Sequence, residues 1–142
     1  KNEIRRSKVG WLNSSPDSQW VYERLSHVVS SLNSELYMFS LSGFGEPIQL
    51  TNYGSEDRGK YGWHQDFNAV ISRKLSLVMQ LTDKEEYEGG NLELLNSPEP
   101  TCIEKKRGLI TLFPSWQLHQ VTPVTKGSRQ SLVCWITGRP FS

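Results

Sequence analysis

Two histidines and one aspartate have the types and the spacing of metal ligands. His64 and Asp66 are separated by one residue, and in an extended backbone residues i and i+2 point to the same face. His119 lies further along the chain, in a segment with the composition of a strand. Two imidazoles and one carboxylate can hold non-haem Fe(II) with three coordination positions open, and a similar set can hold catalytic zinc.

Arg129 and Ser131 add a candidate anion site after the second histidine. In a strand these two side chains share a face. A guanidinium pairs with a carboxylate through two hydrogen bonds, and a nearby hydroxyl can add another. Burying an arginine beside three metal ligands is costly unless an anion meets it, so we expect a dicarboxylate that chelates the metal and pairs with Arg129. A zinc hydrolase is disfavoured by Arg129 and by the lack of a spare general base next to the ligands.

Some seven short strand-like runs, separated by turn residues, fill the chain after Gly45. They occupy residues 48–53, 61–67, 74–82, 91–95, 109–113, 119–124 and 130–137. With one long helix in front, this pattern predicts a mainly β fold of the jelly-roll type with an N-terminal flanking helix. We expect a single domain over residues 1–142, with the jelly-roll core at 48–137.

The first 35 residues are predicted to form an arm and a helix. Residues 1–15 are basic and then aromatic at Trp11, and we expect a solvated arm laid along the domain rather than a partner-binding arm. Ser15 is expected to cap the helix, with Pro16 at its first position. Apolar residues then recur at helical spacing, which predicts one amphipathic helix over 16–35.

Two polar segments near the candidate site are expected at the surface. Residues 54–60 are polar and contain two glycines, which is typical of a mobile lid or binding loop at the approach to a site. Arg73 and Lys74 stand at the start of a strand and are expected to face solvent.

Composition limits the partners and the compartment. The 142 residues suit one domain, and 36% hydrophobic with 11% aromatic residues is too apolar for disorder. A net charge of +1 gives no general attraction for nucleic acid, and no apolar run approaches the roughly 20 residues of a membrane span. Cys102 and Cys134 lack metal or redox spacing and are expected to be buried free thiols. We therefore expect a soluble, cytoplasmic protein with no membrane partner.

The candidate ligands and Arg129 belong to an ordered series of motifs. The series is Tyr61-Gly62-Trp63-His64-Gln65-Asp66, Tyr87-Glu88-Gly89-Gly90-Asn91-Leu92, Phe113-Pro114-Ser115, His119-Gln120-Val121-Thr122-Pro123-Val124 and Gly127-Ser128-Arg129. From about Gln49 to Ile136 the chain resembles the Fe(II)/2-oxoglutarate-dependent dioxygenases, and within them the prolyl 4-hydroxylase-like branch with its bacterial and phage PKHD-type members. The resemblance implies a double-stranded β-helix (jelly roll) flanked by helices. It also implies Fe(II), 2-oxoglutarate and O2, with ascorbate as reductant.

The resemblance assigns roles residue by residue. The iron ligands, and so the catalytic residues, would be His64, Asp66 and His119. The co-substrate would be bound by Arg129, Tyr53, Ser131, Gln80, Leu92 and Trp135, with Arg129 on the distal carboxylate. Gln80 stands where some relatives have tyrosine or threonine, so Ser131 would supply the missing hydroxyl. The substrate would contact Tyr61 and Trp63 at the mouth of the barrel. Tyr53, Trp63 and Trp135 could instead be ordinary structural aromatics.

The resemblance implies hydroxylation of an unactivated C–H bond with release of succinate and CO2. A prolyl residue of a peptide or protein is the expected substrate. The presence of Asp66 disfavours halogenation, because the related halogenases lack this carboxylate. The alternatives are a 2-oxoglutarate-sensing, metal-binding jelly-roll module without turnover, or a hydroxylase of a small molecule or nucleobase. The oligomeric state stays open.

Overall fold

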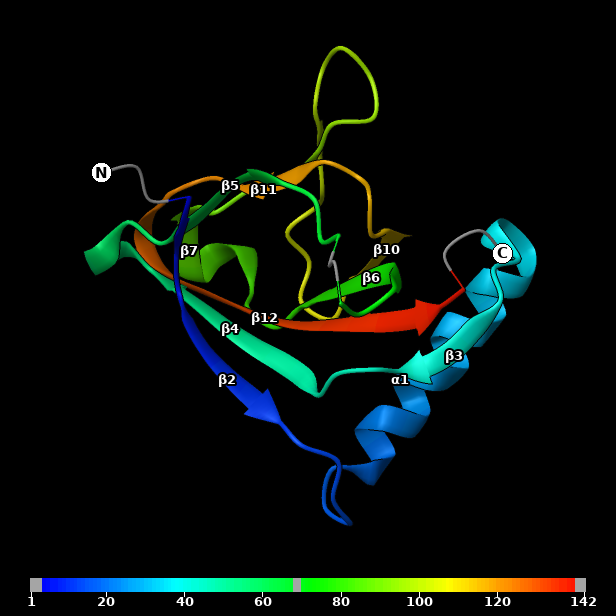
Figure 1. Cartoon of the computed structure of the whole chain (residues 1–142). Coiled ribbons are helices and arrows are strands. Elements are labelled where there is room, and N and C mark those ends of the chain that lie inside the picture. Colours follow the sequence, from blue (N-terminus) through cyan, green and yellow to red (C-terminus); the bar gives the residue numbers. More distant parts are fainter. Residues whose placement is uncertain (1–3, 68–69, 140–142) are drawn as a thin grey trace.

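Two antiparallel sheets face one another in the computed structural model, which describes residues 4–67 and 70–139 (Figure 1). The minor sheet has the order β1 (Arg5–Arg6), β5 (Lys60–His64), β11 (His119–Val121), β8 (Leu92–Leu94) and β9 (Thr101–Cys102). The major sheet has the order β10 (Ile110–Pro114), β6 (Arg73–Gln80), β12 (Val124–Gly138), β4 (Ile48–Gly54) and β2 (Lys8–Leu12). Two further strands, β3 (Leu41–Phe44) and β7 (Tyr87–Gly89), pair with β12. This architecture confirms the predicted mainly β fold.

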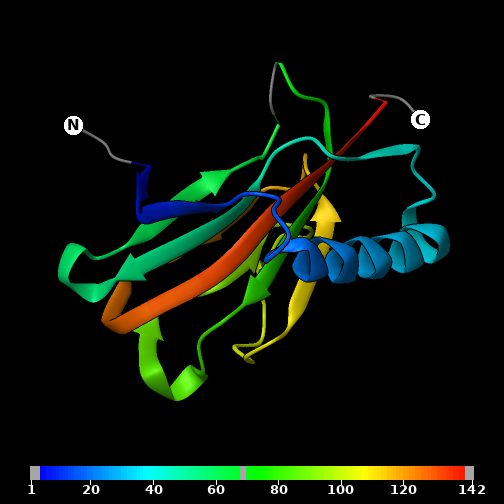
Figure 2. The ribbon, with the colours of Figure 1, turned by 90° about the horizontal axis from the view of Figure 1, so that it is seen from below.

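The long strand β12 separates two apolar cores. Because side chains alternate along a strand, Leu132, Cys134 and Ile136 point to one face and Val133 and Trp135 to the other. The first three pack with Leu25 and Val29 of the helix α1 (Gln19–Leu32). The helix therefore covers the face of the major sheet that is turned away from the minor sheet (Figures 1 and 2). The space between the sheets is left for the second core and the candidate site.

The helix begins three residues later than predicted. Its N-cap is Ser18, whereas Ser15 and Pro16 lie in the preceding turn. The Ser18 hydroxyl donates to the Asn13 carbonyl at 2.7 Å and accepts from the Ser15 backbone N–H at 3.0 Å, so it stabilises this turn. At its other end α1 continues into a π-helical turn (Asn33–Tyr37), which closes at Met38 with φ of 52°. Across the described residues, no helix has the length and apolar character needed to span a bilayer.

The N-terminal arm lies along the domain, and it does so as two strands. β2 pairs with β4 at the edge of the major sheet, and β1 pairs with β5 at the edge of the minor sheet. The arm therefore joins the edges of the two sheets on one side of the barrel (Figure 1). A two-residue strand such as β1 leaves no alternation pattern in the sequence from which it could have been predicted.

Residues 54–60 form a tight connection between β4 and β5. The Gly59 N–H donates to the Gly54 carbonyl at 2.8 Å, and the Val124 N–H donates to the Gly59 carbonyl at 2.9 Å. A Cβ atom at Gly59 would lie 2.7 Å from Tyr53 Cα, so only glycine fits this close approach. None of the seven residues lines the central cavity described below, and their role as a mobile lid or binding loop stays a prediction.

The two cysteines differ in exposure, and the prediction that both are buried is wrong for Cys102. It lies exposed on β9, which pairs only with β8, whereas Cys134 is fully buried under the helix. Burial raises the pKa of the Cys134 thiol to about 12. We expect iodoacetamide at about pH 8.5, near the ordinary thiol pKa, to modify one cysteine in the folded protein and two after unfolding, as counted by mass spectrometry. Equal labelling of both thiols in the folded protein would contradict this burial.

Candidate active site

A cavity of about 400 Å³ lies between the two sheets. Its walls include nine of the residues that the sequence predicts for the site, namely Tyr53, Tyr61, His64, Asp66, Leu92, His119, Arg129, Ser131 and Trp135. Two predicted residues, Trp63 and Gln80, do not line it. The candidate metal ligands and the candidate anion site therefore line the same cavity.

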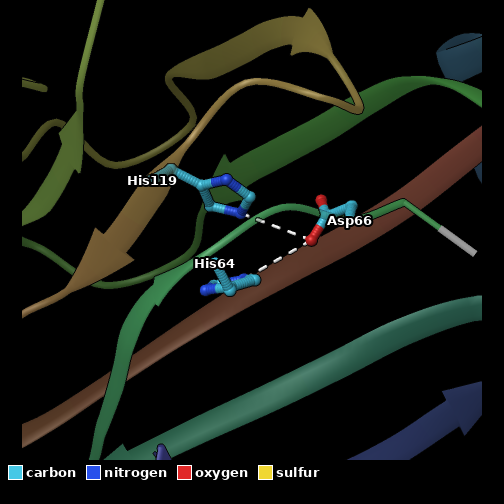
Figure 3. Close-up of side chains that lie close together, drawn as sticks. All are labelled: His64, Asp66 and His119. Carbon is cyan, nitrogen blue, oxygen red and sulfur yellow. Dashed lines mark ion pairs between the residues drawn. The ribbon is translucent and has the colours of Figure 1, made fainter.

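The three candidate metal ligands converge in this cavity (Figure 3). His64 ends β5 and His119 begins β11, and the two are register partners across the strand pair. Each Nε2 atom lies 3.4 Å from Asp66 Oδ1, and the possible ligand atoms all lie within 4.8 Å of one another. The three side chains could therefore hold one metal ion on a single face.

Asp66 is positioned by a contact that the sequence did not indicate. The predicted strand over 61–67 ends at His64, so the alternation of a strand does not place Asp66. Its backbone N–H instead donates to the Ser115 carbonyl at 2.9 Å, which ties the segment after β5 to the turn after β10.

Backbone carbonyls orient both imidazoles. His64 Nδ1 lies 2.7 Å from the Gly62 carbonyl oxygen, and His119 Nδ1 lies 2.8 Å from the Gln117 carbonyl oxygen. A proton on each Nδ1 satisfies these contacts, so each Nε2 faces Asp66 Oδ1, where it can bind a metal ion or, when protonated, donate to that oxygen. This is the orientation that histidine ligands have in metal sites.

The second carboxylate oxygen of Asp66 is held by two donors. Ser76 Oγ donates to Oδ2 at 2.6 Å, and Trp135 Nε1 donates to it at 3.1 Å. Ser76 Oγ also lies 3.0 Å from Ser115 Oγ. Burial acts to raise the pKa of Asp66, but hydrogen bonds with His119, His64 and Ser76 outweigh it and hold that pKa well below its usual range. Asp66 is therefore an ionised candidate ligand with Oδ1 directed to the histidines.

Arg73 and Lys74 are not solvated, contrary to the expectation. Arg73 lines the cavity, donates to the Asp66 carbonyl at 3.1 Å and forms a two-point ion pair with Glu46 at 2.6 Å for each contact. Its guanidinium lies 3.8 Å from the centre of the Trp135 ring. Lys74 is buried, with its ammonium 4.5 Å from the Phe39 ring centre. The cause is that β6 lies between β10 and β12 and has both faces covered.

Arg129 is the candidate anion-binding group of the cavity. It is 2% exposed and is the register partner of Tyr53, whose ring centre lies 5.4 Å from its Cζ atom. Ser131 Oγ lies 3.5 Å from Arg129 Nη1, so the predicted shared face is confirmed. No carboxylate of the described residues forms an ion pair with it. A buried, unneutralised guanidinium that lines a cavity favours an anionic ligand.

Gln80 and Tyr87 lie behind Arg129 rather than in the cavity. Gln80 Nε2 donates to the Tyr87 hydroxyl at 2.5 Å, and both side chains are buried. Burial acts to lower the pKa of Arg129, while Tyr53 and Tyr87 act to raise it, Tyr87 in part through a hydrogen bond. Sequence reasoning gave Tyr87 no role of its own, although Tyr87 and Gly90 belong to one of the motifs. A Cβ atom at Gly90 would lie 3.2 Å from Tyr87 Cε2 and 3.3 Å from Arg129 Cδ, so this glycine lets the two side chains pack closely.

Tyr61 and Trp63 separate because of a bulge. His119 pairs with His64 and Val121 with Tyr61, so β5 has one residue more than β11 across this stretch. The bulge lets Tyr61 stack on His64, with ring centres 3.4 Å apart and planes 8° apart. Trp63 is turned outward and is 37% exposed. Tyr61 therefore lines the cavity and Trp63 does not, and their contact with the substrate stays a prediction.

The donors to Asp66 Oδ2 yield a testable prediction about metal affinity. Ser76→Ala and Trp135→Phe each remove one donor and leave the ligands in place. We expect each to weaken Mn(II) or Co(II) binding about 10- to 100-fold, as measured by calorimetric titration, because such contacts orient the ligand. Ser115→Ala is the graded control with a smaller effect, since Ser115 contacts Ser76 and not the carboxylate. Wild-type affinity in both Ser76→Ala and Trp135→Phe would contradict the orienting role.

Relatives of known family match most of the chain. Residues 48–137 match the family model described as the 2OG-Fe(II) oxygenase superfamily. A PKHD-type hydroxylase of Synechococcus sp. (strain CC9311) is 39% identical over 102 residues, which is 68% of this chain and 46% of the relative. One of Prochlorococcus marinus is 40% identical over 113 residues, which is 77% of this chain and 50% of the relative. The chain spans about half the length of the curated relatives it matches.

Solved structures show the same fold. A prolyl-4-hydroxylase of Pseudomonas putida has a TM-score of 0.76 at 23% identity, over 96% of this chain and 74% of that one. A prolyl hydroxylase of Trichoplax adhaerens, in complex with a hypoxia inducible factor peptide fragment, has a TM-score of 0.80 at 20% identity, over 96% of this chain and 65% of that one. The predicted jelly-roll fold is confirmed by these likenesses.

Proposed function

The chain belongs to the 2OG-Fe(II) oxygenase superfamily, and on this basis we propose that it hydroxylates an unactivated C–H bond. The proposed substrate is a prolyl residue of a peptide or protein, and the proposed by-products of 2-oxoglutarate are succinate and CO2. One observation carries the proposal: three metal-ligating side chains and a buried, unneutralised arginine line the same cavity.

The donor set fits ferrous iron. His64 Nε2, His119 Nε2 and Asp66 Oδ1 would hold it from one side and leave the positions that face the cavity open. Bound iron would supply the activation of O2 that drives oxidation of the C–H bond, and ascorbate would keep the iron reduced. Asp66 remains ionised and contributes one negative charge to the site.

Arg129 would bind the distal carboxylate of 2-oxoglutarate. Ser131 would add a hydroxyl on the same face, while Tyr53, Leu92 and Trp135 would surround the co-substrate and exclude water. Gln80 would not contact the co-substrate. Its hydrogen bond to the Tyr87 hydroxyl would instead fix the side chains against which Arg129 packs. Halogenation is disfavoured because a carboxylate occupies the third ligand position.

A prolyl peptide is proposed as the substrate because several solved structures of this fold are prolyl hydroxylases, one of them with a bound peptide fragment. Tyr61 stacks on His64 at the cavity wall and would contact the bound residue. The two free cysteines agree with a reducing cytoplasm, which we propose as the compartment.

Succinate formation tests the proposal. The purified protein is incubated with Fe(II), 2-oxoglutarate, ascorbate and O2, with and without prolyl peptides, and peptide mass is recorded. We expect succinate in step with a mass gain of one oxygen. Binding of 2-oxoglutarate without succinate would instead indicate a sensing module. Turnover only with free amino acids, nucleosides or other small molecules would move the activity to another substrate class.

A further inference from the structure

Arg5 stands at the entrance of the cavity, one stacking layer beyond Tyr61. It is the register partner of Tyr61 in the β1–β5 pair, and its Cζ atom lies 4.7 Å from the Tyr61 ring centre. The Tyr61 ring in turn lies parallel to the His64 ring at 3.4 Å. The Tyr61 ring thus contacts both Arg5 of the N-terminal arm and the candidate metal ligand His64, and all three residues line the cavity.

The charge of Arg5 has no partner among the described residues. Its Nε donates to Ser7 Oγ at 2.7 Å, which fixes the guanidinium and leaves both terminal nitrogens available. The other two arginines that line the cavity have roles: Arg73 pairs with Glu46, and Arg129 serves the proposed co-substrate. Among the residues that the structure describes, Asp66 is the only acidic side chain in the lining.

The field of Arg5 reaches into the cavity. Burial raises the pKa of Tyr53, and the positive charges of Arg129 and then of Arg5 act against that rise. The cavity lining that includes Arg5 also contains two exposed aromatic side chains, Trp11 at 51% and Phe67 at 74% exposure. A ligand that enters here meets a fixed cation flanked by apolar surface.

We propose that Arg5 binds a carboxylate of the substrate, so that the enzyme prefers prolyl peptides with an acidic residue beside the hydroxylated proline. The inference rests on the proposed function. Stacking on Tyr61 holds the guanidinium plane, and its free edge can make two hydrogen bonds to a carboxylate. Because Arg5 contacts Tyr61 and is not one of the candidate metal ligands, the carboxylate belongs to a residue beside the proline whose C–H bond faces the metal.

The test compares three prolyl peptides that differ only in a flanking Glu, Gln or Lys. Wild type is expected to prefer the Glu peptide over the Gln peptide about tenfold in kcat/KM, with the Lys peptide poorest. Arg5→Gln is expected to erase this order. Arg6→Gln removes the same charge from the adjacent, exposed position of β1 and should leave the order intact. Arg5→Lys keeps a charge without the fork and should retain part of the preference.

Direct binding separates failure of the inference from failure of the proposed function. Anisotropy of the labelled peptides is measured on Mn(II)- and 2-oxoglutarate-loaded protein, with adenosine monophosphate as a phosphate competitor. Arg5-dependent binding of the Glu peptide without turnover would refute prolyl hydroxylation and support the carboxylate site. Four results would each overturn the inference. They are an unchanged order of peptides in Arg5→Gln, a change only in the KM for 2-oxoglutarate, no peptide binding at all, and tighter Arg5-dependent binding of the nucleotide than of the Glu peptide.

Discussion

Asp66→Ala is expected to lower succinate formation by about a thousandfold or more, both with and without substrate. The reason is that it removes the only negative ligand of the candidate metal centre and leaves the Ser76 and Trp135 donors without their acceptor. A metal ion contributes several kcal/mol of stabilisation to the reaction it supports, and each 1.36 kcal/mol is a factor of ten in rate. His64→Ala should have a similar effect, measured as succinate released per enzyme.

The matched control is Asp57→Ala, which removes an exposed carboxylate outside the cavity and should leave activity unchanged.

The stability of the folded protein is followed by thermal unfolding across pH. The pKa of Asp66 is lowered in the folded state, so its ionised form stabilises the fold above the unfolded-state pKa of about 4, and this stability is lost as the pH falls below that value. Asp66→Asn should lack that part of the acid sensitivity. Substantial turnover in folded Asp66→Ala would refute its role as a ligand.

Arg129→Ala is expected to raise the 2-oxoglutarate requirement about 10- to 150-fold and to leave the affinity for metal unchanged. This range corresponds to the loss of a charge-assisted pair worth about 1.5–3 kcal/mol. The effect is specific to the co-substrate because Arg129 lines the same cavity as the ligands but does not belong to the His64–Asp66–His119 group. The KM for 2-oxoglutarate and a Mn(II) titration measure the two quantities separately.

Two variants sharpen this experiment. Arg129→Lys keeps the charge but loses the fork, so we expect an intermediate KM. Arg107→Ala removes an exposed arginine and should have no effect. Since Arg129 is fully buried, each variant is first checked by its thermal unfolding midpoint. An unchanged 2-oxoglutarate KM in a folded Arg129→Ala protein would show that another group binds the distal carboxylate.

The parts of the site that follow from local spacing were predictable. Arg129 and Ser131 share a face because β12 is regular there, and His64 with His119 came from residue type and strand context. Asp66 does lie beside the two histidines, but strand alternation does not place it there: the strand ends at His64, and the Ser115 carbonyl holds the segment beyond it. Spacing alone identified the residues but could not show what positions them.

The parts that depend on contacts between distant strands could not be predicted. Ser76 and Ser115 meet at Asp66 because β6 and β10 pair in one register, and a single serine carries no signal of such a contact. Arg73 looks like a surface residue in sequence because its partner Glu46 lies in another segment. The bulge in β5 likewise depends on its pairing with β11, and Trp63 beside it is exposed rather than in the cavity lining.

The most direct test of the account is an anaerobic optical titration with Fe(II) and 2-oxoglutarate. A 2-oxo acid that chelates ferrous iron gives a visible charge-transfer band that neither component gives alone. We predict this band in the wild-type protein, its loss in Asp66→Ala and His119→Ala, and its appearance only at higher 2-oxoglutarate in Arg129→Ala. If the wild type gives no band, or Asp66→Ala and His119→Ala give it undiminished, the cavity is not the Fe(II)/2-oxoglutarate site.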